Sequence, residues 1–443
     1  MNRTNRVLTA VSVATVVLSH GSVFAQGRME TGSATPTPPR AEARAGSAPD
    51  APPQLLLDHV IAEALEHNPE IAAMARNFDA MTARVPQAKA WPEPMLEVGS
   101  MGSIVPFDVQ NGDPSSGRIV TVTQEIMWPG KLALMGKMAG SEAEAEWWAF
   151  EQSRRMVVAD VKAVYFDLAY LAKAIETVTK NRLLMERVTK IAEARYAVGK
   201  GMQQDLLKAQ LEVTRMTEML TMLEQRQASA AARLNVLMYR DPDSPLGAPA
   251  DIVRRPIDFT LDLLNEMAQA SPILRQQRSR IDREQFALRL AEKQFYPDMS
   301  VAYTYVNRPG MPEMHGVMFG VKLPLYFWQR QRPAVAEASS AMAAERKRLE
   351  SAQALLFFKI KDAYLMALTS EKLADLYATA TIPQATLTLE SGIAAYETGG
   401  IDFLMLLDDL KTLFTYELGY YEQLANLEKA IAMIEPLVGR LLR

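Results

Sequence analysis

The chain has 443 residues, of which 49% are apolar, and a mean hydropathy of -0.07, so it can bury a large core but cannot be a membrane protein with many helical spans. Its 48 Lys and Arg against 52 Asp and Glu give a net charge of -4, which offers no basic surface for nucleic acid. It has no Cys and four His, which excludes disulfides, thiolate sites and an acylated cysteine, and leaves little material for His-based catalysis.

Residues 1–25 have the pattern of a cleaved secretory signal. Arg3 and Arg6 precede the apolar stretch 7–18, and residues 23–25 offer the small side chains that a signal peptidase reads. The alternative is a membrane anchor, but the stretch is well short of the ~20 residues that a spanning helix needs. We therefore expect export from the cytoplasm.

The rest of the chain contains the same order of elements twice. Five short features of the first half recur about 200 residues later. They are Asn68-Pro69, Trp91-Pro92, Tyr165, Tyr196 and Gly199, which recur as Ser271-Pro272, Tyr296-Pro297, Tyr364, Tyr396 and Gly399. We expect a first repeat over residues 55–241, a connector over 242–259 and a second repeat over 260–439.

Residues 26–54, between the expected signal and the first repeat, are rich in Pro, Ala, Gly, Ser and Thr. This composition is typical of a flexible tether, which we expect here.

Each repeat is predicted to carry two short helices, two strands and two long helices. In the first repeat, strand-like alternation covers residues 95–102 and 118–126, and the long helices 131–198 and 202–239 meet at Gly199-Lys200-Gly201, whose glycines tolerate positive φ. A helix of the length of 131–198 would extend for about 100 Å and needs partners along its side. Leu168, Leu171, Ile175 and Val178 have the 3 and 4 spacing of a coiled-coil seam.

The second repeat follows the same plan. Strands are predicted around residues 301–305 and 316–323, with apolar side chains on one face and small or polar ones on the other. The long helices 333–398 and 401–438 meet at Gly399-Gly400. Pro383 is expected to kink the first of them, because proline removes a backbone donor inside a helix.

The four strands are each long enough, at about eight to ten residues, to cross a bilayer at a tilt. A sheet in lipid must close on itself, and the smallest membrane barrels use about eight strands. Several copies must therefore share one barrel, with 8 strands for a dimer, 12 for a trimer or 16 for a tetramer. Four aromatic residues at the ends of the strand pairs are expected to form a membrane-interface girdle, with ordinary core aromatics as the alternative. They are Trp128, Tyr326, Phe327 and Trp328.

From residue 55 to 438 the chain resembles the TolC-like outer-membrane efflux channels, or outer membrane factors, and most of all those attached to heavy-metal pumps. The resemblance rests on the duplicated plan, on two Tyr-x-x-Gly turns, and on the Asp-Leu-Leu and Leu-Leu-Asp runs at 205–207 and 406–408. The turn residues are Tyr196, Gly199, Gly201, Tyr396, Gly399 and Gly400. The resemblance implies a mainly α-helical chain with transmembrane β-strands, a homotrimer with a 12-stranded barrel in outer-membrane lipid, and a helical tunnel in the periplasm that meets an adaptor and an inner-membrane pump, of the RND type.

The resemblance also implies an aspartate ring at the periplasmic entrance. Asp408 matches the ring position, with Asp409 beside it, whereas Met405 stands where the family has a second acidic residue. A solvated helix face is the alternative for both aspartates. We expect three symmetry-related Asp408 carboxylates to bring like charges together and to attract cations, at an entrance held shut by contacts between hairpins.

A loop in the second repeat is the one candidate metal site. Met311, Met314 and His315 offer thioether and imidazole ligands that suit Cu(I) or Ag(I), although Met is also a routine gap filler in helical proteins. We found no motif for catalysis or for a cofactor. The expected function is an exit duct for heavy-metal cations (copper and silver, or cobalt, zinc and cadmium). The alternatives are a multidrug or type I secretion channel, or, from another class, a soluble periplasmic adaptor.

Overall fold

The computed structural model describes residues 54–102 and 109–442, which belong to one compact unit, Ala51–Arg443. The expected signal over 1–25 and all but the last residue of the expected tether over 26–54 lie outside the described residues.

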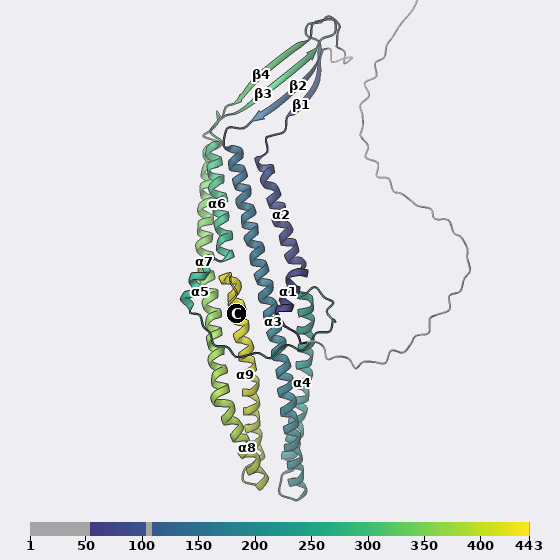
Figure 1. The fold of residues 1–443 in the computed structure, drawn as a ribbon, viewed down its shortest axis with the longest axis vertical. Coiled ribbons are helices and arrows are strands. Elements are labelled where there is room, and N and C mark those ends of the chain that lie inside the picture. Colours follow the sequence, from purple (N-terminus) through teal and green to yellow (C-terminus); the bar gives the residue numbers. More distant parts are fainter. Residues whose placement is uncertain (1–53, 103–108, 443) are drawn as a thin grey trace, which may run out of the picture. The chain divides into compact units, whose positions relative to one another are not determined.

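The described chain has the predicted two-repeat architecture (Figure 1). The first repeat consists of α1 (Leu57–His67), α2 (Pro69–Lys89), β1 (Met95–Met101), β2 (Gly117–Ile126), α3 (Lys131–Ala197) and α4 (Gln203–Leu237). The second consists of α5 (Leu261–Ala268), α6 (Pro272–Lys293), β3 (Asp298–Asn307), β4 (Met314–Lys322), α7 (Gln331–Leu376), the π-helical η1 (Tyr377–Thr381), α8 (Ile382–Thr398) and α9 (Phe403–Val438). The sheet lies at one end of this unit and the α3–α4 and α8–α9 turns at the other.

The recurring Asn-Pro and Ser-Pro pairs are equivalent helix starts. The Asn68 side chain accepts a hydrogen bond from the backbone N–H of Glu70 at 2.9 Å, and Pro69 fills the first position of α2, where no N–H is needed. Ser271 caps α6 in the same way, accepting from the Leu274 N–H at 3.4 Å. Both repeats thus begin their second helix by the same local chemistry.

The four strands form one antiparallel sheet in the order β1-β2-β3-β4, so the sheet joins the two repeats through the β2–β3 pair. Its two faces differ, because successive rows of residues point to opposite sides. One row is Leu96, Val122, Tyr303 and Val317, and the next is Glu97, Thr121, Thr304 and Gly316. All four side chains of the apolar row are exposed, from 42% to 64%. Strands β1 and β4 have no further strand beside them in the described chain.

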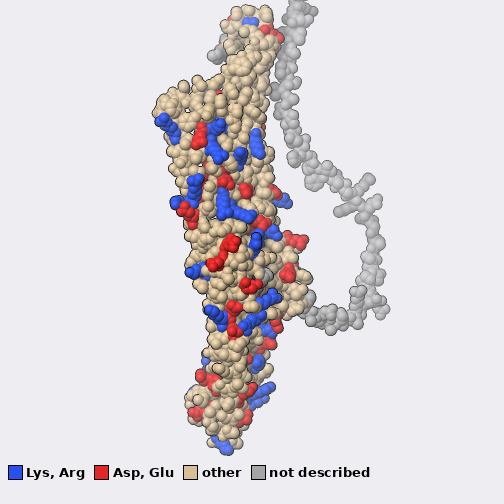
Figure 2. All heavy atoms as spheres, turned by 60° about the vertical axis from the view of Figure 1, so that its left-hand side comes forward, with Lys and Arg blue, Asp and Glu red and all other residues tan. Residues whose placement is uncertain are grey.

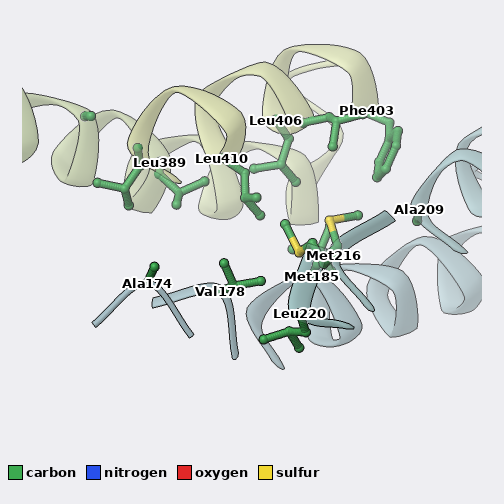
Figure 3. Close-up of a cluster of buried hydrophobic side chains, with 14 of the residues drawn as sticks. Ala174, Val178, Met185, Ala209, Met216, Leu220, Leu389, Phe403, Leu406 and Leu410 are labelled. Carbon is green, nitrogen blue, oxygen red and sulfur yellow. The ribbon is translucent and has the colours of Figure 1, made fainter. Parts of the chain in front are cut away.

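Long antiparallel helices bury the core along their lengths. α3 packs against α2, α4, α6 and α9, and its predicted seam residues Leu168, Leu171 and Val178 are buried. Figure 3 shows Leu406 and Leu410 of α9 facing Val178 and Met185 of α3. The face drawn in Figure 2 carries many charged side chains over the helices and few over the strands. In the described part of the chain, no helix combines the length and apolarity that a membrane span requires.

The helix predicted over residues 333–398 is interrupted. It begins at Gln331 and divides into α7, the π-helical residues 377–381 and α8, with Pro383 in the first turn of α8. A proline lacks the N–H that would bond to the preceding turn, and a π-helical turn accommodates that loss. At the position of the predicted kink, the structure has a π-helical turn between α7 and α8.

Candidate functional site

The turns that join the long helices have the same backbone geometry in both repeats. Gly199 and Gly399 take positive φ values of 73° and 86°. In each turn the glycine N–H bonds to the carbonyl of the residue three before it, and the next N–H reaches the carbonyl of the residue five before it, which is the Schellman motif. Gly201 and Gly400, also predicted as turn residues, do not take positive φ.

The two turn tyrosines have different surroundings. Tyr196 is 44% exposed, whereas Tyr396 is 2% exposed and packs against the ring of Phe403, with a centroid distance of 5.9 Å. Burial raises the pKa of the Tyr396 phenol, and the Asp205 carboxylate raises it further, while Arg195 opposes both. The repeats thus share a backbone turn but not a side-chain environment.

Arg195 joins the two hairpin turns. Its guanidinium donates a hydrogen bond to the Tyr396 carbonyl, lies 4.6 Å from the centroid of the Tyr396 ring, and donates to the Lys200 carbonyl at 3.3 Å. Arg195 is not among the site residues predicted from the sequence. The available signal was its place directly before Tyr196, where the second repeat has Ala395.

Asp408 and Met405 lie on the exposed face of α9. They are three residues apart, which places them on the same side of the helix, while Leu406 and Leu410 point into the core. Asp409 is half-buried. Burial raises the pKa of its carboxyl, and the neighbouring Asp408 carboxylate raises it further.

The four candidate interface aromatics lie where the strands join the helices. Trp128 stacks on Tyr296 with a centroid distance of 5.2 Å and an interplanar angle of 16°. Tyr326 and Trp328 are 69% and 51% exposed, and Phe327 lies beside Phe295 at 6.3 Å. Next to this group, a buried Lys131 pairs with Asp298 at 2.8 Å. The aromatic side chains are thus largely outside the core.

The residues of the candidate metal loop do not converge. Met314 and His315 are neighbours in β4 and therefore point to opposite faces of the sheet. The His315 Nδ1 atom is 2.7 Å from the Tyr303 hydroxyl, and the Tyr305 hydroxyl donates to Glu313 at 2.6 Å. Among the residues that the structure describes, no three His, Cys, Asp or Glu side chains form a group suited to a metal ion.

Two long helical hairpins, each preceded by a strand pair of one shared sheet, are a fold that this chain shares with solved outer-membrane channels. The model of the outer membrane efflux protein family matches residues 60–238 and 263–439. The chain belongs to this family.

Individual relatives are distant in sequence and similar in fold. The cobalt-zinc-cadmium resistance protein CzcC of Cupriavidus metallidurans is 22% identical over 98% of this chain and 100% of its own length. The outer membrane protein VceC of Vibrio cholerae has a TM-score of 0.75 at 16% identity, over 87% of this chain and 97% of that chain. CusC, whose structures are described in terms of folding and transmembrane channel formation, has a TM-score of 0.75 at 14% identity, over 88% of this chain and 93% of that chain.

Proposed function

We propose that this protein is the outer-membrane exit duct of a tripartite efflux system. The observation that carries the proposal is the sheet, which exposes an apolar row of side chains and ends in two unpaired edge strands. Open edges cannot remain in lipid, where backbone groups find neither water nor a partner. Membership of the outer membrane efflux protein family supports the same conclusion.

Three copies would each contribute four strands to a 12-stranded barrel and two hairpins to a helical tunnel. The helices would then lie in the periplasm, after export directed by residues 1–25. The hairpin turns, held by Gly199 and Gly399, would be the end that meets a periplasmic adaptor and an RND-type pump. We assign one repeat to residues 55–241 and the other to 260–439, with a connector over 242–259.

For the cargo, we propose heavy-metal cations. The support is the similarity to a protein whose name states cobalt, zinc and cadmium resistance. The loop with Met311, Met314 and His315 adds little, because two of its three candidate ligands point to opposite faces. Exposed carboxylates such as Asp408 would favour cations over anions at the entrance.

Two measurements test this proposal. The purified protein should require detergent, and its trimer should resist SDS until it is heated; a monomer that is soluble without detergent would contradict the proposal. Deletion of the gene should lower tolerance to cobalt, zinc, cadmium, copper or silver. Unchanged tolerance to all five, with lost tolerance to dyes or detergents, would assign the duct to a drug pump instead.

A further inference from the structure

A pocket of about 440 Å³ lies where the first turns of α3 meet the last turns of α6, next to the sheet. Its polar lining consists of Lys137 from α3 and Arg289, Glu292, Lys293 and Tyr296 from α6 and the segment that follows it. Three cations therefore share a pocket with one carboxylate, which leaves a formal excess of two positive charges.

The three cations have no ion-pair partner in the described chain. Lys137 and Arg289 lie against the ring of Phe286, at 5.6 and 5.8 Å from its centroid, and Lys293 lies 5.0 Å from the centroid of Tyr296. The aromatic rings hold these side chains in place without neutralising them. The pocket is therefore suited to an anion.

Favourable interaction with a helix dipole explains the position of only two of the three pocket cations. Arg289 and Lys293 are near the C-terminus of α6, where positive side chains interact favourably with the helix dipole. Lys137 is in the second turn of α3, beyond the first turn in which the dipole of that helix acts, so the dipole does not account for its charge. The third cation thus needs a different reason.

The surroundings indicate which anion the pocket would meet. Tyr296 stacks on Trp128, directly beside the sheet whose apolar face is exposed. Cations also follow the aromatic residues after β4: Trp328 precedes Arg330 and Arg332, and Arg332 lies 5.3 Å from the centroid of the Phe327 ring. Aromatic rings at the level of lipid headgroups, with cations just beyond them, are typical of surfaces that contact anionic phospholipids.

We propose that the pocket binds the phosphodiester headgroup of an anionic phospholipid of the phosphatidylglycerol type, in the inner leaflet of the outer membrane. The inference rests on the proposed membrane function, because only a barrel in the membrane brings the pocket to headgroup level. Tyr296 and Trp128 would lie beside the glycerol backbone, and the three cations would contact the phosphate.

The test is native mass spectrometry of the full-length assembly with defined lipids. Wild-type protein, the triple variant K137Q/R289Q/K293Q, and the charge-matched control R187Q/K190Q/K200Q at the far end of the α3–α4 hairpin are each incubated with phosphatidylglycerol or phosphatidylcholine. We expect wild type and control to retain phosphatidylglycerol selectively. The pocket variant should bind it more weakly by about fivefold for each lost cation, or roughly a hundredfold in total.

Equal retention of phosphatidylglycerol by the pocket variant and the control would overturn the proposal, as would equal retention of both lipids by wild type. Displacement of the bound lipid from wild type by millimolar inorganic phosphate would assign the pocket to a soluble anion and would also overturn it. Channel conductance is recorded from the same preparations. Normal conductance with no lipid selectivity removes only this inference, whereas no conductance and no oligomer would remove the proposed function itself.

Discussion

At the level of single residues, Arg195 makes the clearest contact between the two repeats, since it links the α3–α4 turn to the α8–α9 turn. Arg195→Ala leaves the Tyr396 carbonyl without this charged donor, a loss of about 1.5–3 kcal/mol. We expect amide hydrogen exchange across residues 396–400 to become about tenfold faster or more. Arg187→Ala, which removes an exposed arginine of the same helix, is the control and should leave that exchange unchanged.

Asp409 should make the stability of the folded protein depend on pH. Because burial and Asp408 raise the pKa of its carboxyl, the folded state favours the protonated form. The contribution of Asp409 to stability should be fully present below the ordinary Asp pKa and should be lost as the pH rises from there through the raised pKa. Asp409→Asn should therefore raise the melting temperature at pH 7 and remove this part of the pH dependence.

Thermal unfolding at pH 4 and pH 7 measures the effect. Glu397→Gln, at an exposed position of α8, is the matched control for the loss of one negative charge. A melting temperature that falls at pH 7 in the Asp409→Asn protein would show that the ionised carboxylate has a stabilising partner.

Residue-scale prediction from the sequence succeeded where the cause is local. Gly199 and Gly399 follow from the need for positive φ at a helix end. Arg195 could not be found in this way, because its contact with Tyr396 depends on how two hairpins about 200 residues apart lie side by side. Met314 and His315 are adjacent in a strand and therefore point to opposite faces of the sheet. Their proposal as metal ligands rested on residue type and did not take this alternation into account.

At the level of elements, Lys162 of α3 and Glu435 of α9 form a buried ion pair at 2.7 Å that connects the two repeats. Removal of one partner leaves an uncompensated buried charge. Lys162→Met and Glu435→Gln should therefore each lower the free energy of unfolding by about 3–5 kcal/mol. The double variant should lose less free energy of unfolding than the two single variants lose together. Chemical unfolding of all four proteins gives the coupling energy.

An exposed pair provides the comparison. Arg76 and Asp79 of α2 are 3.0 Å apart with mostly exposed side chains, and Arg76→Gln should cost no more than about 1 kcal/mol. If the Lys162 and Glu435 variants cost as little as this one, burial contributes nothing to the strength of the pair.

Elements were predicted better than their ends and interruptions. Composition and periodicity indicated every long helix, and the strands were predicted at the correct places, although β3 extends from Asp298 to Asn307 rather than over 301–305. Proline at 383 predicted a kink, whereas the π-helical turn found there does not follow from residue type alone. Tyr377, in that turn, contacts Tyr416 of α9, with a centroid distance of 5.3 Å.

At the level of the whole molecule, the proposed role of Asp408 exists only in an assembly. In one copy it is an exposed carboxylate on α9, whereas three copies around a shared axis would bring like charges together. Asp408→Ala should lower cation selectivity and change the single-channel conductance in planar bilayers, and Asp402→Ala, another exposed aspartate near the same turn, should not. Conductance and selectivity equal to wild type would remove Asp408 from the entrance.

Assembly is also where the sequence is least informative. A closed barrel with four strands from each chain would need several copies, but periodicity does not distinguish 8, 12 or 16 strands, and the family resemblance supplies the choice of three.

The open sheet edges have a consequence for the folding and assembly of a newly synthesised chain. In the proposed assembly, each polypeptide would present the open edges of β1 and β4 next to the exposed apolar face of the sheet until it met its neighbours. Such edges pair readily with any other strand, including those of unfolded proteins. Yield should therefore depend on how quickly copies find one another, and crowding of unassembled chains should lead to precipitation rather than to a pool of stable intermediates.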